Sequence, residues 1–66
     1  MKYELNGETF EAPGPVSVLE LLRQHELTGR RIAVAINAEV VPRSRFATAE
    51  IGDGDRVEVI HAVGGG

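Results

Sequence analysis

Cysteine is absent from this chain of 66 residues, and so is tryptophan. Without cysteine the chain holds no disulfide, thiolate metal site, iron–sulfur cluster or cysteine nucleophile, which fits a reducing compartment. We therefore expect the protein in the cytoplasm. Long hydrophobic runs are also missing, because the apolar stretches are only a few residues each, so we expect no signal peptide and no transmembrane span.

Basic residues are few as well. Seven Lys and Arg against ten Asp and Glu give a formal net charge of −3. Nucleic acids and anionic membranes are bound through basic patches, so we expect neither as a partner. A mildly acidic surface suits a partner protein with a basic docking face.

Residue groupings that carry catalysis or bind metals are scarce too. His25 and His61 have neither a cysteine nor a second histidine at helical spacing beside them, so we expect no metal site. Asp53 and Asp55 flank a glycine, but the ligand pattern of a calcium loop does not follow, which favours a tight turn. No nucleophile elbow surrounds Ser44. We therefore predict a protein that is not itself an enzyme.

What the chain does contain is a series of short apolar patterns. Asn6-Gly7 is a strong hairpin signal, Pro42 confines its strand to a sheet edge, and Ile32–Ile36 suits a strand buried on both faces. The five stretches with strand character are 1–5, 8–12, 32–36, 40–41 and 56–63.

One helix is expected between the second and third of these strands. Ser17 with Glu20 forms a capping box at its start, and Thr28-Gly29 is expected to end it. We also expect one helical turn within residues 44–50 that places Phe46 as a plug. One amphipathic helix over one face of a mixed sheet of about five strands is an α+β fold.

The final strand has two different faces. Val57 and Val59 are expected to point toward the helix, and period-two alternation then sends Ile60 and Ala62 to an open face. A small apolar patch of this kind, close to the end of the chain, is typical of a transient docking surface. We assign partner docking to Ile60, Ala62 and Val63.

The sequence ends in three glycines, Gly64, Gly65 and Gly66. Such a tail packs no core, but with no Cβ it passes through a narrow channel, and the four residues 63–66 reach at most roughly 13–14 Å. We divide the chain into a domain over 1–62 and a flexible tail over 63–66. Alternatively, the glycines are a frayed terminus or a remnant of cloning.

Several of these features together resemble one family, the sulfur carrier proteins of thiamin biosynthesis, which are small ubiquitin-like β-grasp domains. The resemblance covers the whole chain. It is carried by the hairpin–helix–strand order, the segment 35–43, the turn Asp53-Gly54-Asp55 and the terminal Gly65-Gly66.

The resemblance implies a β-grasp fold whose last strand is central and parallel to the first. It also implies that an E1-like adenylyltransferase, using ATP and Mg²⁺, activates the Gly66 carboxylate. A persulfide or sulfide donor then converts Gly66 to a thiocarboxylate, whose sulfur passes to thiazole synthase. On this interpretation the chain is a cosubstrate that binds no cofactor of its own.

Other functions are compatible with the same sequence. The tail also suits a sulfur carrier for molybdopterin synthesis or tRNA thiolation, and a ubiquitin-like modifier joined through Gly66 to lysines of target proteins. A third possibility is a β-grasp domain that binds partners non-covalently and makes no use of its tail.

Overall fold

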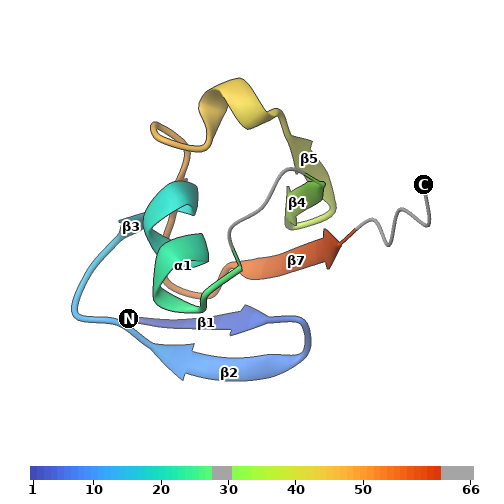
Figure 1. Cartoon of the computed structure of the whole chain (residues 1–66). Helices are drawn as coiled ribbons and strands as arrows, with labels where there is room; N and C mark the ends of the chain where they lie inside the picture. Colours follow the sequence, from blue (N-terminus) through green and yellow to red (C-terminus); the bar gives the residue numbers. More distant parts are fainter. Residues whose placement is uncertain (28–30, 62–66) are drawn as a thin grey trace.

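The computed structural model describes residues 1–27 and 31–61 (Figure 1). Its main sheet has five strands in the order β2-β1-β7-β4-β5. The strand bounds are Lys2–Leu5 for β1, Glu8–Glu11 for β2, Ile32–Ile36 for β4, Glu39–Val41 for β5 and Arg56–His61 for β7. Strand β7 is central, parallel to β1 and antiparallel to β4, so the sheet is mixed. This arrangement confirms the expected α+β, β-grasp architecture, including the edge position of β5.

Two tight turns join neighbouring strands of the sheet. Asn6 and Gly7 connect β1 to β2 with φ values of 50° and 87°, as a type I′ turn requires. Asn37 and Ala38 connect β4 to β5 with φ values of 51° and 71°. The second turn therefore forces an alanine into the left-handed region, which favours glycine.

The helix α1, Val18–Gln24, begins where the sequence predicts. Its N-cap is Ser17, whose Oγ accepts a hydrogen bond from the Glu20 N–H at 3.0 Å. The Val18 and Leu19 N–H groups bond to the carbonyls of Ala49 and Phe46, at 2.9 and 2.8 Å. The loop ahead of β6 thus satisfies the otherwise unpaired donors at the helix start.

The predicted helix end, at Thr28-Gly29, is wrong. Helix α1 stops at Gln24, and Glu26 takes a φ of 56°. The N–H groups of Glu26 and Leu27 then bond to the carbonyls of Arg23 and Leu22, at 3.1 and 2.7 Å. This is a Schellman motif with glutamate at the position usually held by glycine, so the sequence carried no visible stop signal. Thr28 and Gly29 lie outside the described residues.

Two short strands were not predicted. Val16–Ser17 (β3) pairs antiparallel with Glu50–Ile51 (β6) in a separate two-stranded sheet. Each strand has only two residues, which is too short for an alternation pattern to show. The pairing holds Ile51 fully buried.

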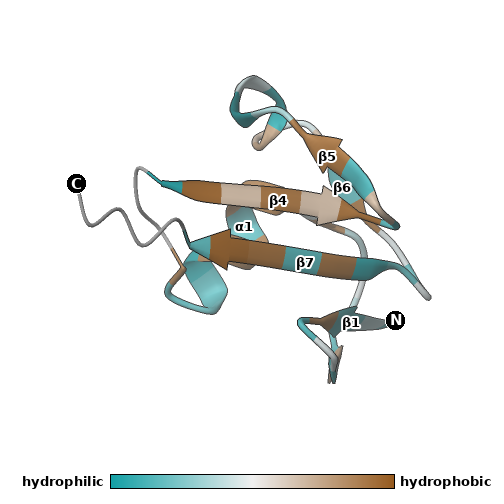
Figure 2. Ribbon diagram, turned by 90° about the vertical axis from the view of Figure 1, so that its right-hand side faces the viewer, coloured by the Kyte–Doolittle hydropathy of each residue, from teal (hydrophilic) through white to brown (hydrophobic). Residues whose placement is uncertain are grey.

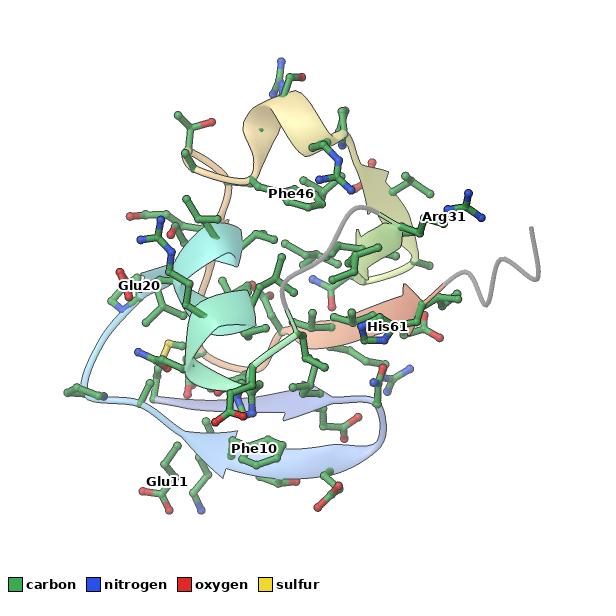
Figure 3. The ribbon with its side chains drawn as sticks, viewed as in Figure 1. Phe10, Glu11, Glu20, Arg31, Phe46 and His61 are labelled. Carbon is green, nitrogen blue, oxygen red and sulfur yellow. The ribbon has the colours of Figure 1, made fainter. Side chains whose placement is uncertain are left out.

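The core lies between α1 and one face of the main sheet. Phe46 follows the 3-10 helix η1 (Arg43–Arg45) and is buried, which confirms its expected role as a plug (Figure 3). The buried apolar residues are Tyr3, Leu5, Val18, Leu21, Leu22, Ile32, Val34, Phe46, Ile51, Val57 and Val59.

Within residues 1–27 and 31–61, no helix lies over the other face of the main sheet. Figure 2 shows β4 and β7 in front, with α1 behind them. In β4, Ile32 and Val34 are buried, whereas Ala33 is exposed and Ala35 half-buried. The prediction that this strand is buried on both faces is therefore wrong, because the single helix covers only one.

Within the described residues, no helix is both long enough and apolar enough to span a bilayer.

Candidate functional site

Strand β7 is the element that carries the chain toward its C-terminal residues. It is paired with β4 along its length, from Ile36↔Val57 to Ile32↔His61. Asparagine side chains from the two tight turns bind it as well. The Arg56 N–H donates to Asn37 Oδ1 at 3.0 Å, and the Val59 N–H donates to Asn6 Oδ1 at 2.9 Å. Strand β7 is thus held from both sides.

The two faces of β7 differ as expected. Val57 is completely buried and Val59 is 7% exposed, whereas Ile60 is 63% exposed. Glu58 is also exposed. The alternation therefore places Ile60 on the open face, one residue before the strand ends at His61.

Ile60 belongs to a larger patch than the sequence predicted. Ala33 lies opposite Ile60 across the β4–β7 pair, and Ala35 lies opposite Val40 across the β4–β5 pair. Val40 is 77% exposed. We call these four residues, Ala33, Ala35, Val40 and Ile60, the Ile60 patch. Val40 was missed because the short strand 40–41 gave no indication of which valine faces the core. Ala33 and Ala35 were missed because their strand was predicted to be buried on both faces.

Charged side chains border the Ile60 patch. Arg56 Nε lies 3.4 Å from Glu4 Oε2 on the neighbouring strand, and both side chains are well exposed. An exposed pair of this kind contributes little to stability. Glu58, between Arg56 and Ile60 on the same face, makes no ion pair with any described residue. An apolar centre with a charged rim is the usual anatomy of a protein-docking surface.

The other residues predicted for the site lie outside residues 1–27 and 31–61. They are the docking residues Ala62 and Val63 and the tail residues Gly64, Gly65 and Gly66. Of the predicted site residues the structure thus places Ile60 alone, and it confirms the expected exposure of that side chain.

The histidine at the end of α1 belongs to an aromatic cluster at the core edge. His25 Nε2 lies 2.9 Å from the Tyr3 hydroxyl, and its ring meets that of Phe10 edge-on, with centroids 4.6 Å apart. Burial raises the pKa of the Tyr3 phenol. These contacts are explained by packing. No group of three acidic, histidine or cysteine side chains suited to a metal ion occurs within residues 1–27 and 31–61.

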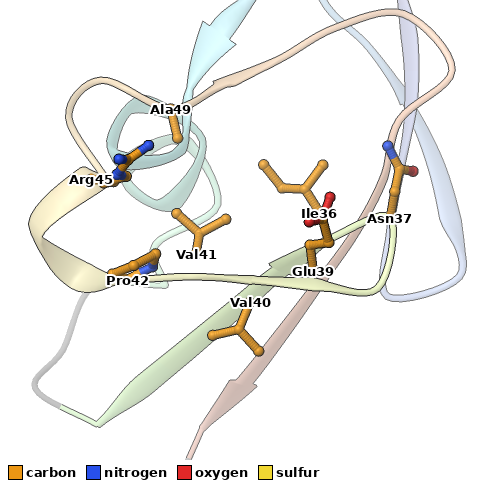
Figure 4. Close-up of a pocket in the computed structure, with 8 residues that line it drawn as sticks. All are labelled: Ile36, Asn37, Glu39, Val40, Val41, Pro42, Arg45 and Ala49. Carbon is orange, nitrogen blue, oxygen red and sulfur yellow. The ribbon is translucent and has the colours of Figure 1, made fainter.

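A hollow lies at the β5 edge of the sheet. It has a volume of ≈430 Å³ and lies between β5 and the segment from Arg45 to Ala49 (Figure 4). Ile36 and Val41 point into it, whereas Val40 points the opposite way, toward the open face. Glu39 and Arg45 supply its charged groups.

Comparison with known proteins decides the family. The ThiS family matches residues 3–66, nearly the whole chain. The chain belongs to the ThiS family. This confirms the resemblance inferred from the sequence.

Individual ThiS relatives agree in length and fold. The sulfur carrier protein ThiS of Bacillus subtilis is 32% identical over 64 residues, covering 96% of this chain and 97% of that protein. The crystal structure of the thiamine biosynthesis protein ThiS from Geobacter metallireducens superposes with a TM-score of 0.85. That protein is 32% identical, and the match covers both chains completely.

A ThiS-like segment also occurs within longer proteins. A thiazole synthase of Paramagnetospirillum magneticum is 36% identical over 66 residues, which is all of this chain but only 20% of that protein. The chain therefore spans about a fifth of the length of this relative.

Proposed function

We propose that this protein is a sulfur carrier of thiamin biosynthesis whose Gly66 carboxylate, as the terminal group, is activated and converted to a thiocarboxylate. The observation that carries the proposal is the ThiS family match, which runs through Gly66. The chain is then a protein cosubstrate, and the bond-making steps belong to partner enzymes.

The chemistry explains why a carboxylate needs activation. Direct attack by sulfur on a carboxylate would have to expel oxide, which is a very poor leaving group. Transfer of AMP from ATP to the Gly66 carboxylate releases pyrophosphate and gives an acyl-adenylate. Hydrosulfide then attacks the acyl carbon, AMP leaves, and the thiocarboxylate remains. A persulfide donor would give an acyl disulfide, which a thiol must then reduce. In both routes ATP and Mg²⁺ bind to the adenylating partner.

The tail sequence suits this chemistry. Glycine at positions 64 and 65 presents no side chain to a channel wall, and Gly66 leaves its carbonyl open to attack. Strand β7 supplies a fixed base, since β4, Asn6 and Asn37 all bind it. A tether fixed at one end holds the carboxylate near a bound partner's active site.

Thiazole synthase is the acceptor that the relatives favour. A protein named thiazole synthase carries a segment 36% identical to the whole of this chain, and physical linkage in one polypeptide is a common arrangement for partners that act together. We therefore favour sulfur delivery to thiazole formation over molybdopterin synthesis or tRNA thiolation. The Ile60 patch is the surface we assign to docking.

The deciding experiment is intact mass spectrometry. The chain, ending at Gly66, is incubated with an E1-like adenylating enzyme, ATP, Mg²⁺ and sulfide. We expect one oxygen to be replaced by one sulfur, with the change confined to the C-terminal residue. Omitting ATP is the control. An unchanged mass with an enzyme that thiolates the B. subtilis protein would contradict the proposal, and adducts on lysines of other proteins would favour the modifier function.

A further inference from the structure

The Ile60 patch is not flat. A hollow of ≈100 Å³ opens within it, lined mostly by apolar side chains. Val40 of β5 and Ile60 of β7 stand on either side of β4, and they are the two large apolar side chains that are strongly exposed in the described residues. Ala33 and Ala35 of β4 lie between them and line the floor.

The two alanines create the hollow. Across the β4–β5 pair Ala35 faces Val40, and across the β4–β7 pair Ala33 faces Ile60, so each large side chain has a methyl group beside it. Side chains opposite each other in a sheet have Cβ atoms about 4.5–5.5 Å apart, so larger residues at 33 and 35 would fill the space. We call this hollow, bounded by Ala33, Ala35, Val40 and Ile60, the alanine socket.

One charged group lies on the rim of the socket. Glu58 lines it and pairs with Ala35 across the sheet. Arg56, the nearest cation on the same strand, is engaged with Glu4 at 3.4 Å. The Glu58 carboxylate has no cationic partner within residues 1–27 and 31–61, so a cation from outside is its complement.

We propose that the alanine socket receives a single apolar side chain of thiazole synthase, flanked by a lysine or arginine that pairs with Glu58. This proposal rests on the proposed function, which makes thiazole synthase a partner, and adds how that partner is recognised. The volume fits one aliphatic side chain, and an anchor residue in a pocket is where binding energy concentrates. The adenylating enzyme and a second copy of this chain are the alternative occupants.

A variant that fills the socket distinguishes between two modes of binding. In one, a partner side chain is anchored in the socket, and in the other, the partner contacts a flat apolar surface. Ala33 is exposed, so Ala33→Leu enlarges the apolar surface while occupying the socket. We expect it to weaken thiazole synthase binding about tenfold or more, measured by isothermal titration calorimetry. A flat patch would bind equally well or more tightly. Ala47→Leu adds the same side chain at an exposed position outside the patch and should leave binding unchanged. Ala35→Val is the second socket variant should Ala33→Leu fail to fold.

The proposed ion pair between Glu58 and a cation of thiazole synthase is tested with Glu58→Gln. We expect weaker binding and a smaller dependence of the affinity on salt concentration, because a charge pair is lost. Val40→Ala, which removes one wall, should also weaken binding. Unchanged affinity in both socket-filling variants, or loss of binding to the adenylating enzyme alone, would overturn the proposal. So would sedimentation showing that the wild-type chain dimerises through this face.

A failure of the proposed function gives a different result. In that case the wild-type chain forms no thiocarboxylate and does not bind thiazole synthase. If only the socket inference fails, the wild-type chain binds thiazole synthase and the variants bind it equally well.

Discussion

The side-chain oxygen of Asn6 accepts a hydrogen bond from the Val59 N–H at 2.9 Å, joining residues 53 positions apart. The backbone N–H of Asn6 also donates to the Val57 carbonyl at 2.9 Å. The parallel β1–β7 pairing runs only from Glu4↔Arg56 to Leu5↔Val57. Asn6 therefore extends this ladder by one step while it turns the chain into β2. The turn residue thus has two functions, a left-handed backbone and a contact to the central strand β7.

We expect Asn6→Gly to separate these two functions. Glycine keeps the positive φ of the turn but removes the bond to Val59, so the free energy of unfolding should fall by about 0.5–1.5 kcal/mol. Asn6→Ala should lose about 1–2 kcal/mol more, because alanine resists the left-handed backbone. Urea denaturation measures the free energy of unfolding of both variants. In both, hydrogen exchange of the Val59 amide should be faster than in the wild-type chain. If Asn6→Gly leaves that exchange rate unchanged, the side-chain bond does not hold β7.

Ala38→Gly should stabilise the protein. Ala38 has a φ of 71° in the β4–β5 turn, where an L-residue costs about 1–2 kcal/mol relative to glycine. Part of this gain is offset by the greater freedom of glycine in the unfolded chain, so we expect a net gain of up to about 1 kcal/mol in urea denaturation. Ala47→Gly is the matched control, because Ala47 is exposed and has no positive φ. It should be neutral or destabilising, and equal effects at both positions would contradict the explanation.

Stability should fall at alkaline pH because of Tyr3. Burial raises the pKa of this phenol in the folded state, so the unfolded chain releases the proton first as pH increases. The contribution of Tyr3 to the free energy of unfolding is fully present below the pKa of the unfolded chain, about 10. It is lost as pH rises from there through the pKa of the folded state. Tyr3→Phe should flatten this decline, although it also loses the hydrogen bond to His25. Chemical denaturation at pH values from 8 to 11 or so provides the test, and an equally steep decline in the variant would assign it to other groups.

Ile60→Asp should impair binding without unfolding the protein. Ile60 is 63% exposed, so the free energy of unfolding should change by no more than about 0.5 kcal/mol. Affinity for thiazole synthase, the partner proposed for this surface, should fall by roughly 1–3 kcal/mol, as for an interface anchor. The neighbouring change Val59→Asp places a charge in the core, since Val59 is 7% exposed, and should unfold the domain. Normal binding by Ile60→Asp would remove Ile60 from the docking surface.

Deleting Gly66, or adding residues after it, should abolish activation. The reason is chemical, because the proposal requires a free glycine carboxylate at the end of a tail without side chains. The melting temperature should barely change, since the core residues all lie between Tyr3 and Val59. Adenylation is followed by pyrophosphate release and by intact mass. Normal adenylation of a C-terminally extended chain would refute the requirement for a free end.

Some elements could be predicted from the sequence because their signals are local. Asn6-Gly7 specifies a type I′ turn by its own backbone preferences, and Ser17 with Glu20 marks a helix start. The helix end escaped prediction because Glu26 adopts a left-handed backbone without being glycine. Strands β3 and β6 escaped prediction because two residues carry no periodicity. They pair through residues that are distant in the sequence, Val16 with Ile51 and Ser17 with Glu50.

The sequence by itself determined the fold class, the family and the open-face position of Ile60. Each depends on alternation, turn chemistry or residue order along the chain. Only the tertiary structure decided that Ala33, Ala35 and Val40 join Ile60 on one surface, since strand pairing brings together segments that are distant in sequence. An alanine in a strand does not indicate by itself whether its position is buried or exposed, because its one methyl group fits either face of the sheet. Helix α1 covers the other face of the sheet, so on this face Ala33 is exposed and Ala35 is half-buried.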